Sequence, residues 1–389
     1  MDEYFKPFFK KIKTIPVFKS EGFIYGLYVV MAVTEAVQQS RTGSHNNFLI
    51  FQHSVFHFFA GLNPYLEYPK EYGDIFLYNP SFPVLFLPFA YLPTLAGLIT
   101  WSVLTTSVYF LAIKSLPLTR NQKLFIFYVA IPELNTAVSN LQTNPLIAAF
   151  TILAMTSLEK GAYKKFALYP ALNFFIKGYG GIAAIFFLLK KPSFKIFFYL
   201  CICFLAVGLL PLCFYSFTRF TTIYQQWFES LKNYGSKNAG ISVMGIARSL
   251  IYKDVSTVAI QLAGVAVFLI TFIAVLAKKN YEQVKFYFLA NVLIWMVIFN
   301  HVAESPTYLI ASTGVLIWFV CSKKKPVDLL LFIFFCMLTL LSPTDLFPKY
   351  LRVHYVVPYC LKALPCIFIW IKIQFALIGV PLPQPKQNI

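Results

Sequence analysis

The sequence has little charge for its length. Asp, Glu, Lys and Arg make up 12% of its 389 residues, whereas 58% are hydrophobic, and the mean hydropathy is +0.67. Soluble domains contain about 25% charged and about 45–50% apolar residues. The composition therefore excludes a soluble enzyme, a secreted disulfide scaffold and a disordered chain. It predicts a multi-pass membrane protein.

Acidic residues are scarce, with 15 Asp and Glu against 33 Lys and Arg and a net charge of +18. In a soluble chain this balance would suggest nucleic-acid binding. Here the cations occupy short runs between apolar segments, as the positive-inside rule predicts, so we expect no nucleic-acid partner. The seven cysteines lie in or beside apolar segments without a CxxC pair, and we expect from them neither a metal site nor disulfides.

Apolar segments dominate the chain, and a helical span needs about 20 apolar residues. The candidate spans are 22–39, 94–113, 124–140, 145–158, 196–217, 257–277, 286–302, 306–321, 327–342 and 359–380. Residues 82–92 are too short to cross, and 166–189 are interrupted at Lys177 by a glycine-rich stretch. We expect an all-α polytopic protein with about ten to thirteen transmembrane or re-entrant helices.

The distribution of Lys and Arg predicts the orientation. Most of the 33 cations lie in the N-terminal tail, in short loops and in the C-terminal tail. We therefore expect cytoplasmic termini and long loops outside. The N-terminus shows no cleavable signal pattern, so the first span is expected to remain as an anchor. Parity requires 166–189 to enter and return as two half-helices hinged at Lys177, which is tolerated only beside a protein cavity.

These features predict a single integral membrane domain over residues 1–389. Its parts are a first span at 22–39, an outer loop at 40–81, a helical module at 82–217, a large outer loop at 218–256 and the C-terminal spans at 257–380. The histidines and many acids fall in the expected outer loops or at their edges. We therefore expect the functional site to face outward.

The first outer loop begins with an apolar periodic segment. Within 47–60, Phe48, Phe51, Val55 and Phe58 recur at three- and four-residue spacing, which is typical of an amphipathic helix on a membrane surface. Gly61 is expected to end this helix.

The segment after this helix contains a G-x-N-P-Y motif, an acidic and aromatic stretch, Y-x-P and an apolar run ending in L-P, with the residues Gly61, Asn63, Pro64, Tyr65, Tyr78, Pro80, Leu92 and Pro93. This order of motifs resembles glycosyltransferase family 87, part of the C-type polytopic membrane glycosyltransferases. Further matching segments are 140–144, 175–179, 227–245 and 299–305. In order and spacing the likeness covers roughly 20–320.

The resemblance implies an enzyme that transfers a sugar, often mannose, from a polyprenyl-phosphate donor to a lipid or glycan acceptor. Expected partners are that donor, the acceptor and membrane lipids, with no cofactor, at the outer face of a bacterial inner membrane. Asn47, Tyr65, Gln142 and Asn144 are the expected substrate-binding residues. Two alternatives stay open: a transporter or flippase of lipid-linked saccharides, since broken half-helices also occur in transporters, and a catalytically silent relative.

The catalytically silent alternative arises from one departure from the family pattern. The family often carries an Asp at the start of the surface helix, where it resembles a catalytic base, and this chain has Asn47 there. An amide cannot accept a proton in that way. Either the activity is altered, or another acid replaces it: Asp74, Glu71 or Glu304.

Lys177 is the strongest candidate for binding the donor phosphate. A Lys at the bilayer centre costs about 2.5–3.5 kcal/mol on insertion scales, and the nearby Gly178, Gly180 and Gly181 would let a phosphate approach the backbone. The structural alternatives are that Lys177 pairs with Glu133 or extends to water. Arg248 is the second expected phosphate ligand, with lipid headgroups as its alternative partner.

Two histidine patterns remain. His301 and Glu304 are three residues apart, so on a helix they would share one face, with Glu304 orienting His301 for catalysis or, alternatively, capping a helix. His53 and His57 have an i, i+4 spacing that suits a metal. The sequence shows no third ligand nearby, so no metal site is predicted.

Overall fold

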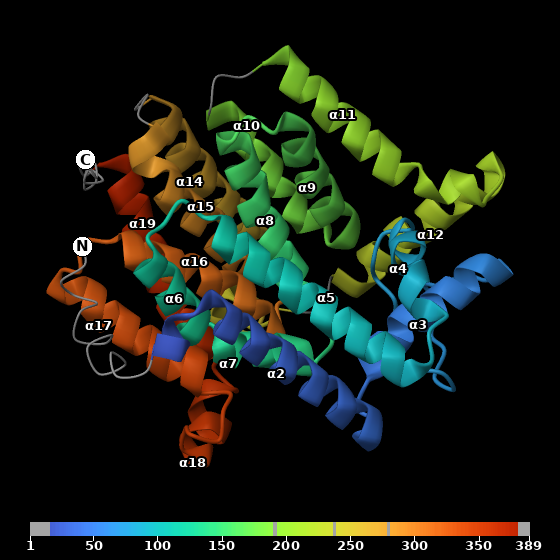
Figure 1. Cartoon of the computed structure of the whole chain (residues 1–389), viewed down its shortest axis with the longest axis horizontal. Helices are drawn as coiled ribbons and strands as arrows, with labels where there is room; N and C mark the ends of the chain where they lie inside the picture. The colour runs from blue at the N-terminus through green and yellow to red at the C-terminus, as the bar shows by residue number, and fades with distance from the viewer. Residues whose placement is uncertain (1–15, 190–192, 236–238, 278–280, 380–389) are drawn as a thin grey trace.

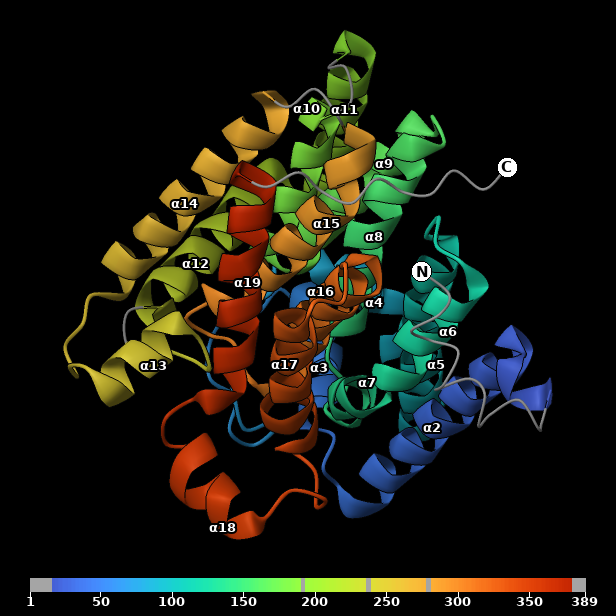
Figure 2. The ribbon, with the colours of Figure 1, turned by 90° about the vertical axis from the view of Figure 1, so that its left-hand side faces the viewer.

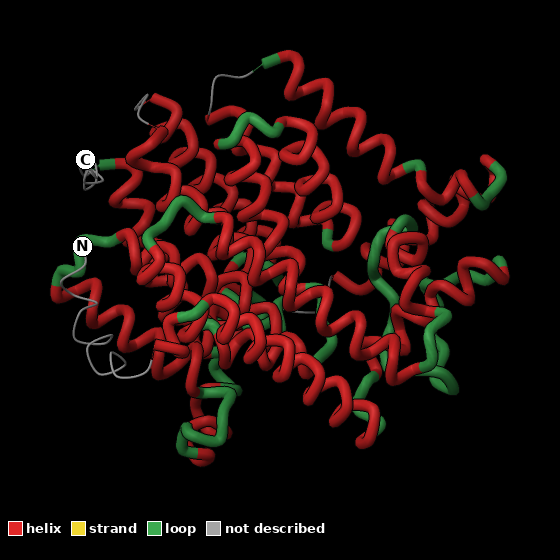
Figure 3. The backbone as a smooth tube through the Cα atoms, in the orientation of Figure 1, coloured by secondary structure: helices red, strands yellow, loops and turns green. Residues whose placement is uncertain are grey.

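The computed structural model describes residues 16–189, 193–235, 239–277 and 281–379 (Figure 1). Regular structure in these ranges is helical, without strands (Figure 3), which confirms the expected all-α class. The α-helices are α2 Glu21–Thr42, α3 Asn46–Ala60, α4 Phe82–Ala90, α5 Thr94–Ser115, α6 Arg120–Val129, α7 Ile131–Ser139, α8 Asn144–Glu159, α9 Tyr163–Ile176, α10 Phe186–Leu189, α11 Phe194–Gly208, α12 Phe217–Gly235, α13 Val243–Leu250, α14 Thr257–Ala277, α15 Tyr281–Ile298, α16 Tyr308–Cys321, α17 Pro326–Phe335, α18 Lys349–Leu351 and α19 Leu364–Ile378.

Short segments of other helical types connect them. The 3-10 helices are η1 Pro16–Lys19, η2 Gly178–Ile185, η3 Leu210–Cys213, η4 Ser305–Thr307 and η7 Leu361–Ala363, and the π-helical segments are η5 Cys336–Leu341 and η6 Arg352–Val356. The expected outer loop at 218–256 is thus largely helical, since it contains most of α12 and all of α13.

Helix α16 forms the centre of the molecule. Every one of its residues is buried, as expected for a helix that is apolar on all sides. Its closest neighbour is α15, and a Cβ at Gly314 would lie 2.9 Å from the carbonyl oxygen of Ala290. Around this pair pack α8, α9 and α5 on one side and α19 and α14 on the other, as Figure 2 shows for the latter.

Three of the described helices are long and apolar enough to cross a membrane: α5, α14 and the continuous Leu361–Ile378. Six further apolar helices are shorter. Large apolar side chains stand exposed along α11 and α14, for example Phe198, Leu262 and Ile270. An apolar surface of this kind is stable against lipid and is not expected against water.

Several expected spans are broken in the structure. The segment 124–140 divides into α6 and α7 at Ala130, two residues before Pro132, which lies near the start of α7. Proline lacks an N–H and its ring clashes with the preceding turn. The segment 286–302 ends at Ile298 because the Asn300 side chain accepts a hydrogen bond from the Val302 amide and forms a turn. The segment 196–217 already ends as an α-helix at Gly208.

The expected break at Lys177 is present. Helix α9 ends at Ile176, Lys177 is extended with φ −137° and ψ 112°, and η2 then packs against α9 and α8. Asn173 and Phe174 pack closely against this turn. A Cβ at Gly180 would lie 2.9 Å from Asn173, and a Cβ at Gly181 would lie 2.9 Å from Phe174. Glycine therefore permits the close approach that turns the chain.

The expected helix over 47–60 is observed as α3, but its apolar stripe does not face outward. Phe48, Phe51, Val55 and Phe58 are at most 2% exposed, and α3 packs along α4 (Figure 1). Phe51 touches Phe86 of α4 at a ring-centroid distance of 5.4 Å. The side predicted to rest on the bilayer is thus covered by the short apolar helix at 82–90.

Candidate functional site

Polar side chains from two distant turns meet at the break after α9. Lys177 Nζ donates to Asn144 Oδ1 at 2.9 Å and to Gln142 Oε1 at 3.3 Å. Asn144 begins α8, and Gln142 lies in the turn before it, where Leu141 takes a left-handed φ of 53°. The structure therefore brings together three of the expected binding residues, Gln142, Asn144 and Lys177, while a substrate role for them stays a prediction.

Within the described ranges, the charge of Lys177 is not neutralised by a close carboxylate. Its hydrogen-bond partners there are neutral amides, and no ion pair involves it. An ammonium group has three donors, and the two amides use two of them. One N–H and the positive charge are left for an anionic oxygen. The expected alternative, pairing with Glu133, is wrong because Glu133 pairs with another lysine.

Tyr78 and Glu304 flank this ammonium group. Lys177 Nζ lies 5.9 Å from the centre of the Tyr78 ring, and the Tyr78 hydroxyl lies 3.3 Å from Thr143 Oγ1. The Glu304 carboxylate acts electrostatically on both Lys177 and Tyr78. A cation and a phenol from distant parts of the chain thus lie close together, and the Glu304 carboxylate is near enough to act on both electrostatically.

The backbone around Tyr78 is held firmly. Tyr65 donates its hydroxyl to the Tyr78 carbonyl at 3.0 Å, and Trp227 of α12 donates its indole N–H to the Leu77 carbonyl at 3.1 Å. Asn47 donates to the carbonyl of Asn140 at 2.8 Å. Tyr65 and Asn47, both expected to bind substrate, are therefore seen fixing the backbone of the site.

Glu304 is positioned by a buried ion pair. Its backbone carbonyl accepts a hydrogen bond from the Thr307 amide at 3.0 Å, and its own amide donates to the Thr307 hydroxyl at 3.2 Å. The next residue, Ser305, receives hydrogen bonds from Lys362 Nζ at its hydroxyl (2.8 Å) and its carbonyl (3.1 Å). Lys362 Nζ also lies 2.8 Å from Glu133 Oε1. The pair between η7 and α7 therefore fixes the segment that carries Glu304.

The expected pairing of His301 with Glu304 is wrong. The turn at Asn300 interrupts the helix, so the two side chains do not share a helical face, and His301 Nδ1 instead lies 3.0 Å from Gln261 Nε2 of α14. Burial lowers the pKa of His301, so it is neutral at pH 7.

Asp74 and Arg248 show local partners. The exposed Asp74 accepts a hydrogen bond from the Ile75 amide at 2.7 Å. Arg248 lies on α13, and its Nε donates at 3.4 Å to the Val255 carbonyl in the loop before α14. Their expected roles as base and phosphate ligand stay predictions.

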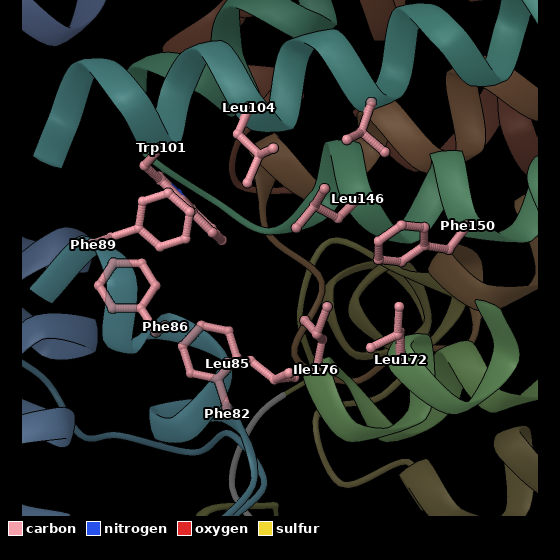
Figure 4. A pocket seen from close by; sticks show the side chains of 11 residues that line it. Phe82, Leu85, Phe86, Phe89, Trp101, Leu104, Leu146, Phe150, Leu172 and Ile176 are labelled. Carbon is pink, nitrogen blue, oxygen red and sulfur yellow. The ribbon is translucent and has the colours of Figure 1, made fainter. Parts of the chain in front are cut away.

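The structure contains an apolar pocket of about 200 Å³ (Figure 4). Its walls come from α4, α5, α8 and α9: Phe82, Leu85, Phe86, Phe89, Trp101, Leu104, Val108, Leu146, Phe150, Leu172 and Ile176. Ile176 directly precedes Lys177, and Leu146 is two residues from Asn144. The chain therefore passes from the pocket wall to the polar site at two places, and an apolar pocket with a cation nearby suits an amphiphile with an anionic head.

A second histidine-containing group is centred on α3. His53 Nδ1 and His57 Nε2 approach Glu71 Oε2 at 3.0 and 2.8 Å. Burial lowers the pKa of His57, against an opposing effect of Glu71. The sequence-based statement that no third ligand lies nearby is therefore wrong, because the loop after α3 brings Glu71 back over the helix.

Sequence reasoning misses several residues of the site. It names Tyr78 only as part of a motif, and it does not single out Thr143 or Lys362. Tyr78 carries a signal, since it lies between an acidic loop and Pro80. Lys362 carries a weaker one, as a cation within an apolar segment.

The comparisons with known proteins agree with this architecture. The model of glycosyltransferase family 87 matches residues 76–306, which is more than half of the chain. No curated protein and no solved structure matches the chain. The matched range contains Tyr78, the turn at 142–144, Lys177 and Glu304. The chain therefore belongs to glycosyltransferase family 87 and is a membrane glycosyltransferase.

Proposed function

We propose that the protein transfers a hexose, with mannose as the first candidate, from a polyprenyl-phosphate donor to a lipid or glycan acceptor at the outer face of the membrane. The observation that carries this proposal is the ammonium of Lys177, which hydrogen-bonds to no carboxylate among the described residues and directly follows Ile176 of the apolar pocket. Its remaining N–H would contact the donor phosphate, while the isoprenoid chain would occupy the space between Phe86 and Leu172.

The reaction we propose is a single displacement. The acceptor hydroxyl oxygen bonds to the anomeric carbon, the bond from that carbon to the phosphate oxygen breaks, and the electron pair leaves with polyprenyl phosphate. The configuration at the anomeric carbon inverts. Lys177 stabilises the charge that grows on the leaving phosphate, which is where fixed cations and donors contribute most to catalysis.

Glu304 is the acid we propose as the general base. It acts electrostatically on Lys177 and Tyr78, whereas Asp74 is engaged with its neighbouring amide and Glu71 with two histidines. A carboxylate at the site can take the acceptor proton. Glu304 would thus replace the acid that is absent at Asn47.

The substrate-binding set we propose is Gln142, Asn144 and Tyr78. Asn144 Nδ2 is buried and lacks a hydrogen-bond partner among the described residues. A buried amide without a partner is costly unless a ligand or water satisfies it. We assign it to an oxygen of the donor phosphate or sugar.

The test is sugar transfer by the purified full chain in nanodiscs, with radiolabelled polyprenyl-phosphate sugars and membrane-lipid acceptors. We expect transfer from one donor, lost by at least about 100-fold in Lys177→Ala. The exposed Lys165→Ala, on helix α9 that ends just before Lys177, is the matched control and should retain transfer.

Other results would point elsewhere. Transfer that depends on a nucleotide sugar alone would contradict the proposed donor. Movement of lipid-linked saccharide across liposomes without transfer would favour the transporter. Absence of transfer from every donor, in protein shown to bind the lipids, would favour the silent relative.

A further inference from the structure

The site on α3 has the composition of a metal centre. His53 and His57 are one helical turn apart, and Glu71 faces them from the following loop. The three ligand atoms lie within 4.8 Å of one another. We call these three residues the α3 cluster. Imidazole and carboxylate together are the donor set of many three-ligand zinc sites.

The loop that carries Glu71 is fixed before any ligand binds. The amides of Glu71 and Tyr72 both donate to the Tyr68 carbonyl, at 2.8 and 3.1 Å. Two residues later, the Gly73 amide donates at 2.8 Å to Asn46 Oδ1 at the start of α3. The loop is therefore attached to the start of α3. The three ligand atoms are held close together by the fold, so a bound ion would not need to order a flexible segment.

Hydrogen bonds alone leave the α3 cluster incompletely satisfied. Glu71 Oε2 faces two ring nitrogens, His53 Nδ1 at 3.0 Å and His57 Nε2 at 2.8 Å. Among the described residues, the buried His57 Nδ1 and Tyr72 hydroxyl lack hydrogen-bond partners. Tyr72 lies beside the cluster, with its ring centre 5.8 Å from that of His53. Buried polar atoms without partners are rare and call for a ligand.

The surroundings admit a cation from one side. His57 is only 4% exposed and packs on Tyr68, with ring centres 3.8 Å apart. The side chains of His53 and Glu71 are 25% and 34% exposed. The inner ligand is thus rigid, and the outer two are accessible to an ion and to the water that would complete its coordination.

We propose that the α3 cluster binds one divalent cation of the zinc class through His53, His57 and Glu71. Ligand bonds of about 2.0–2.2 Å place tetrahedral ligands about 3.3 Å apart. The observed separations of 3.0 and 2.8 Å need to open by only a few tenths of an ångström. Imidazole ligands favour zinc-class ions over Mg²⁺ or Ca²⁺.

The cation would act as a clamp and take no part in the transfer. It would join α3 to the loop that continues from Glu71 to Tyr78, the residue beside Lys177. Phe51 of α3 also touches the Tyr78 ring, at 5.0 Å between centres. Metal binding would therefore stabilise the wall of the proposed active site without contacting the donor.

The test uses the full chain purified without a polyhistidine tag, stripped with EDTA and titrated with Zn²⁺ against a chelating indicator. We expect one high-affinity Zn²⁺ per chain, unaffected by millimolar Mg²⁺, and a rise in melting temperature on binding. Glu71→Gln and His53→Ala should each weaken binding at least about tenfold and abolish the rise. His45→Ala and His354→Ala, which change histidines outside the α3 cluster, should leave both unchanged.

Two results would overturn the proposal. One is the absence of stoichiometric Zn²⁺ binding; the other is binding that survives in both Glu71→Gln and His53→Ala. If Glu71→Gln fails to fold, the more exposed His53→Ala still decides the question. None of these measurements depends on sugar transfer, so failure of the clamp and failure of the proposed function are distinguishable.

Discussion

Two lysines in apolar surroundings, Lys177 and Lys362, show how differently one residue type can be used. Lys362 Nζ contacts both oxygens of Glu133, at 2.8 and 3.1 Å, and two atoms of Ser305. Among the described residues, the hydrogen bonds of Lys177 Nζ reach only the neutral oxygens of Gln142 and Asn144. The first cation is committed to the fold, whereas the second retains charge for a ligand.

The two lysines also differ in their burial and in the elements around them. Lys362 of η7 is 4% exposed and packs against α7 and η4. Lys177 is half-buried at the break between α9 and η2, and its neighbour Ile176 lines the apolar pocket. Glu304 acts on this charge without a hydrogen bond to it, and a charge kept without a directly bonded counter-ion at such a place is costly. Its retention is explained if the counter-ion belongs to a substrate.

The largest expected effect concerns the base beside Lys177. Glu304→Gln removes the proton acceptor but keeps the shape, so we expect transfer to fall about 10²–10⁴-fold while donor binding is retained. Asp74→Asn is the matched control, with an expected change below about twofold. The measurement is kcat for transfer together with the Kd of the donor lipid. A large loss in Asp74→Asn and none in Glu304→Gln would reassign the base.

The next effect concerns Lys362, the lysine that is paired with Glu133. Lys362→Met leaves the Glu133 carboxylate buried and unpaired, so we expect a loss of about 3–5 kcal/mol in the free energy of unfolding. Adding Glu133→Leu should restore most of it, because an apolar pair replaces the ion pair. Denaturant unfolding in detergent measures both. Equal stability of the single and double variants would show that the pair is not coupled.

How far the sequence predicts the structure differs between these two lysines. The break at Lys177 follows from local glycines and from loop charges, so local reasoning predicts it. The partner of Lys362 lies 229 positions away at Glu133, and no local pattern reveals such a pair. Long-range polar contacts inside a helical protein are chosen by packing, which hydropathy does not report.

The α3 region teaches the same lesson. Periodicity predicts helix α3 with bounds within one residue of those observed. It does not predict the side that the helix buries, because covering by α4 depends on how a nine-residue apolar helix packs. Glu71 joins His53 and His57 only through the folded loop. The helical pairing of His301 with Glu304 fails because it rests on spacing where Asn300 makes a turn.

A smaller effect concerns the wall that holds Tyr78 near Lys177. Trp227→Phe keeps the aromatic packing and removes the hydrogen bond to Leu77, worth about 0.5–1.5 kcal/mol. We expect a severalfold rise in KM for the donor. Trp295→Phe removes an equivalent bond to Gly264, 3.1 Å long and between α14 and α15. An equal rise in the KM for the donor in Trp227→Phe and Trp295→Phe would mean that both variants act through a general loss of stability.

The smallest effect is a pH dependence from His301. Burial lowers its pKa from the usual value of about 6.5, so the folded chain binds fewer protons there than the unfolded chain. This contribution to stability is complete above about pH 6.5 and declines as the pH falls below it. Melting temperatures between pH 7.5 and 5 should fall less in His301→Gln than in wild type. The exposed His354→Gln is the control, and an identical decline in His301→Gln would contradict the assignment.

The most direct test of the difference between the two lysines is the affinity for polyprenyl phosphate, the common product, measured in nanodiscs. A hydrogen bond to a charged group contributes about 1.5–3 kcal/mol, so we predict that Lys177→Met weakens binding about 10- to 150-fold. The doubly substituted Lys362→Met, Glu133→Leu chain should bind within about twofold of wild type. Unchanged affinity in Lys177→Met, in protein that melts like wild type, would contradict the proposal that Lys177 holds the donor phosphate.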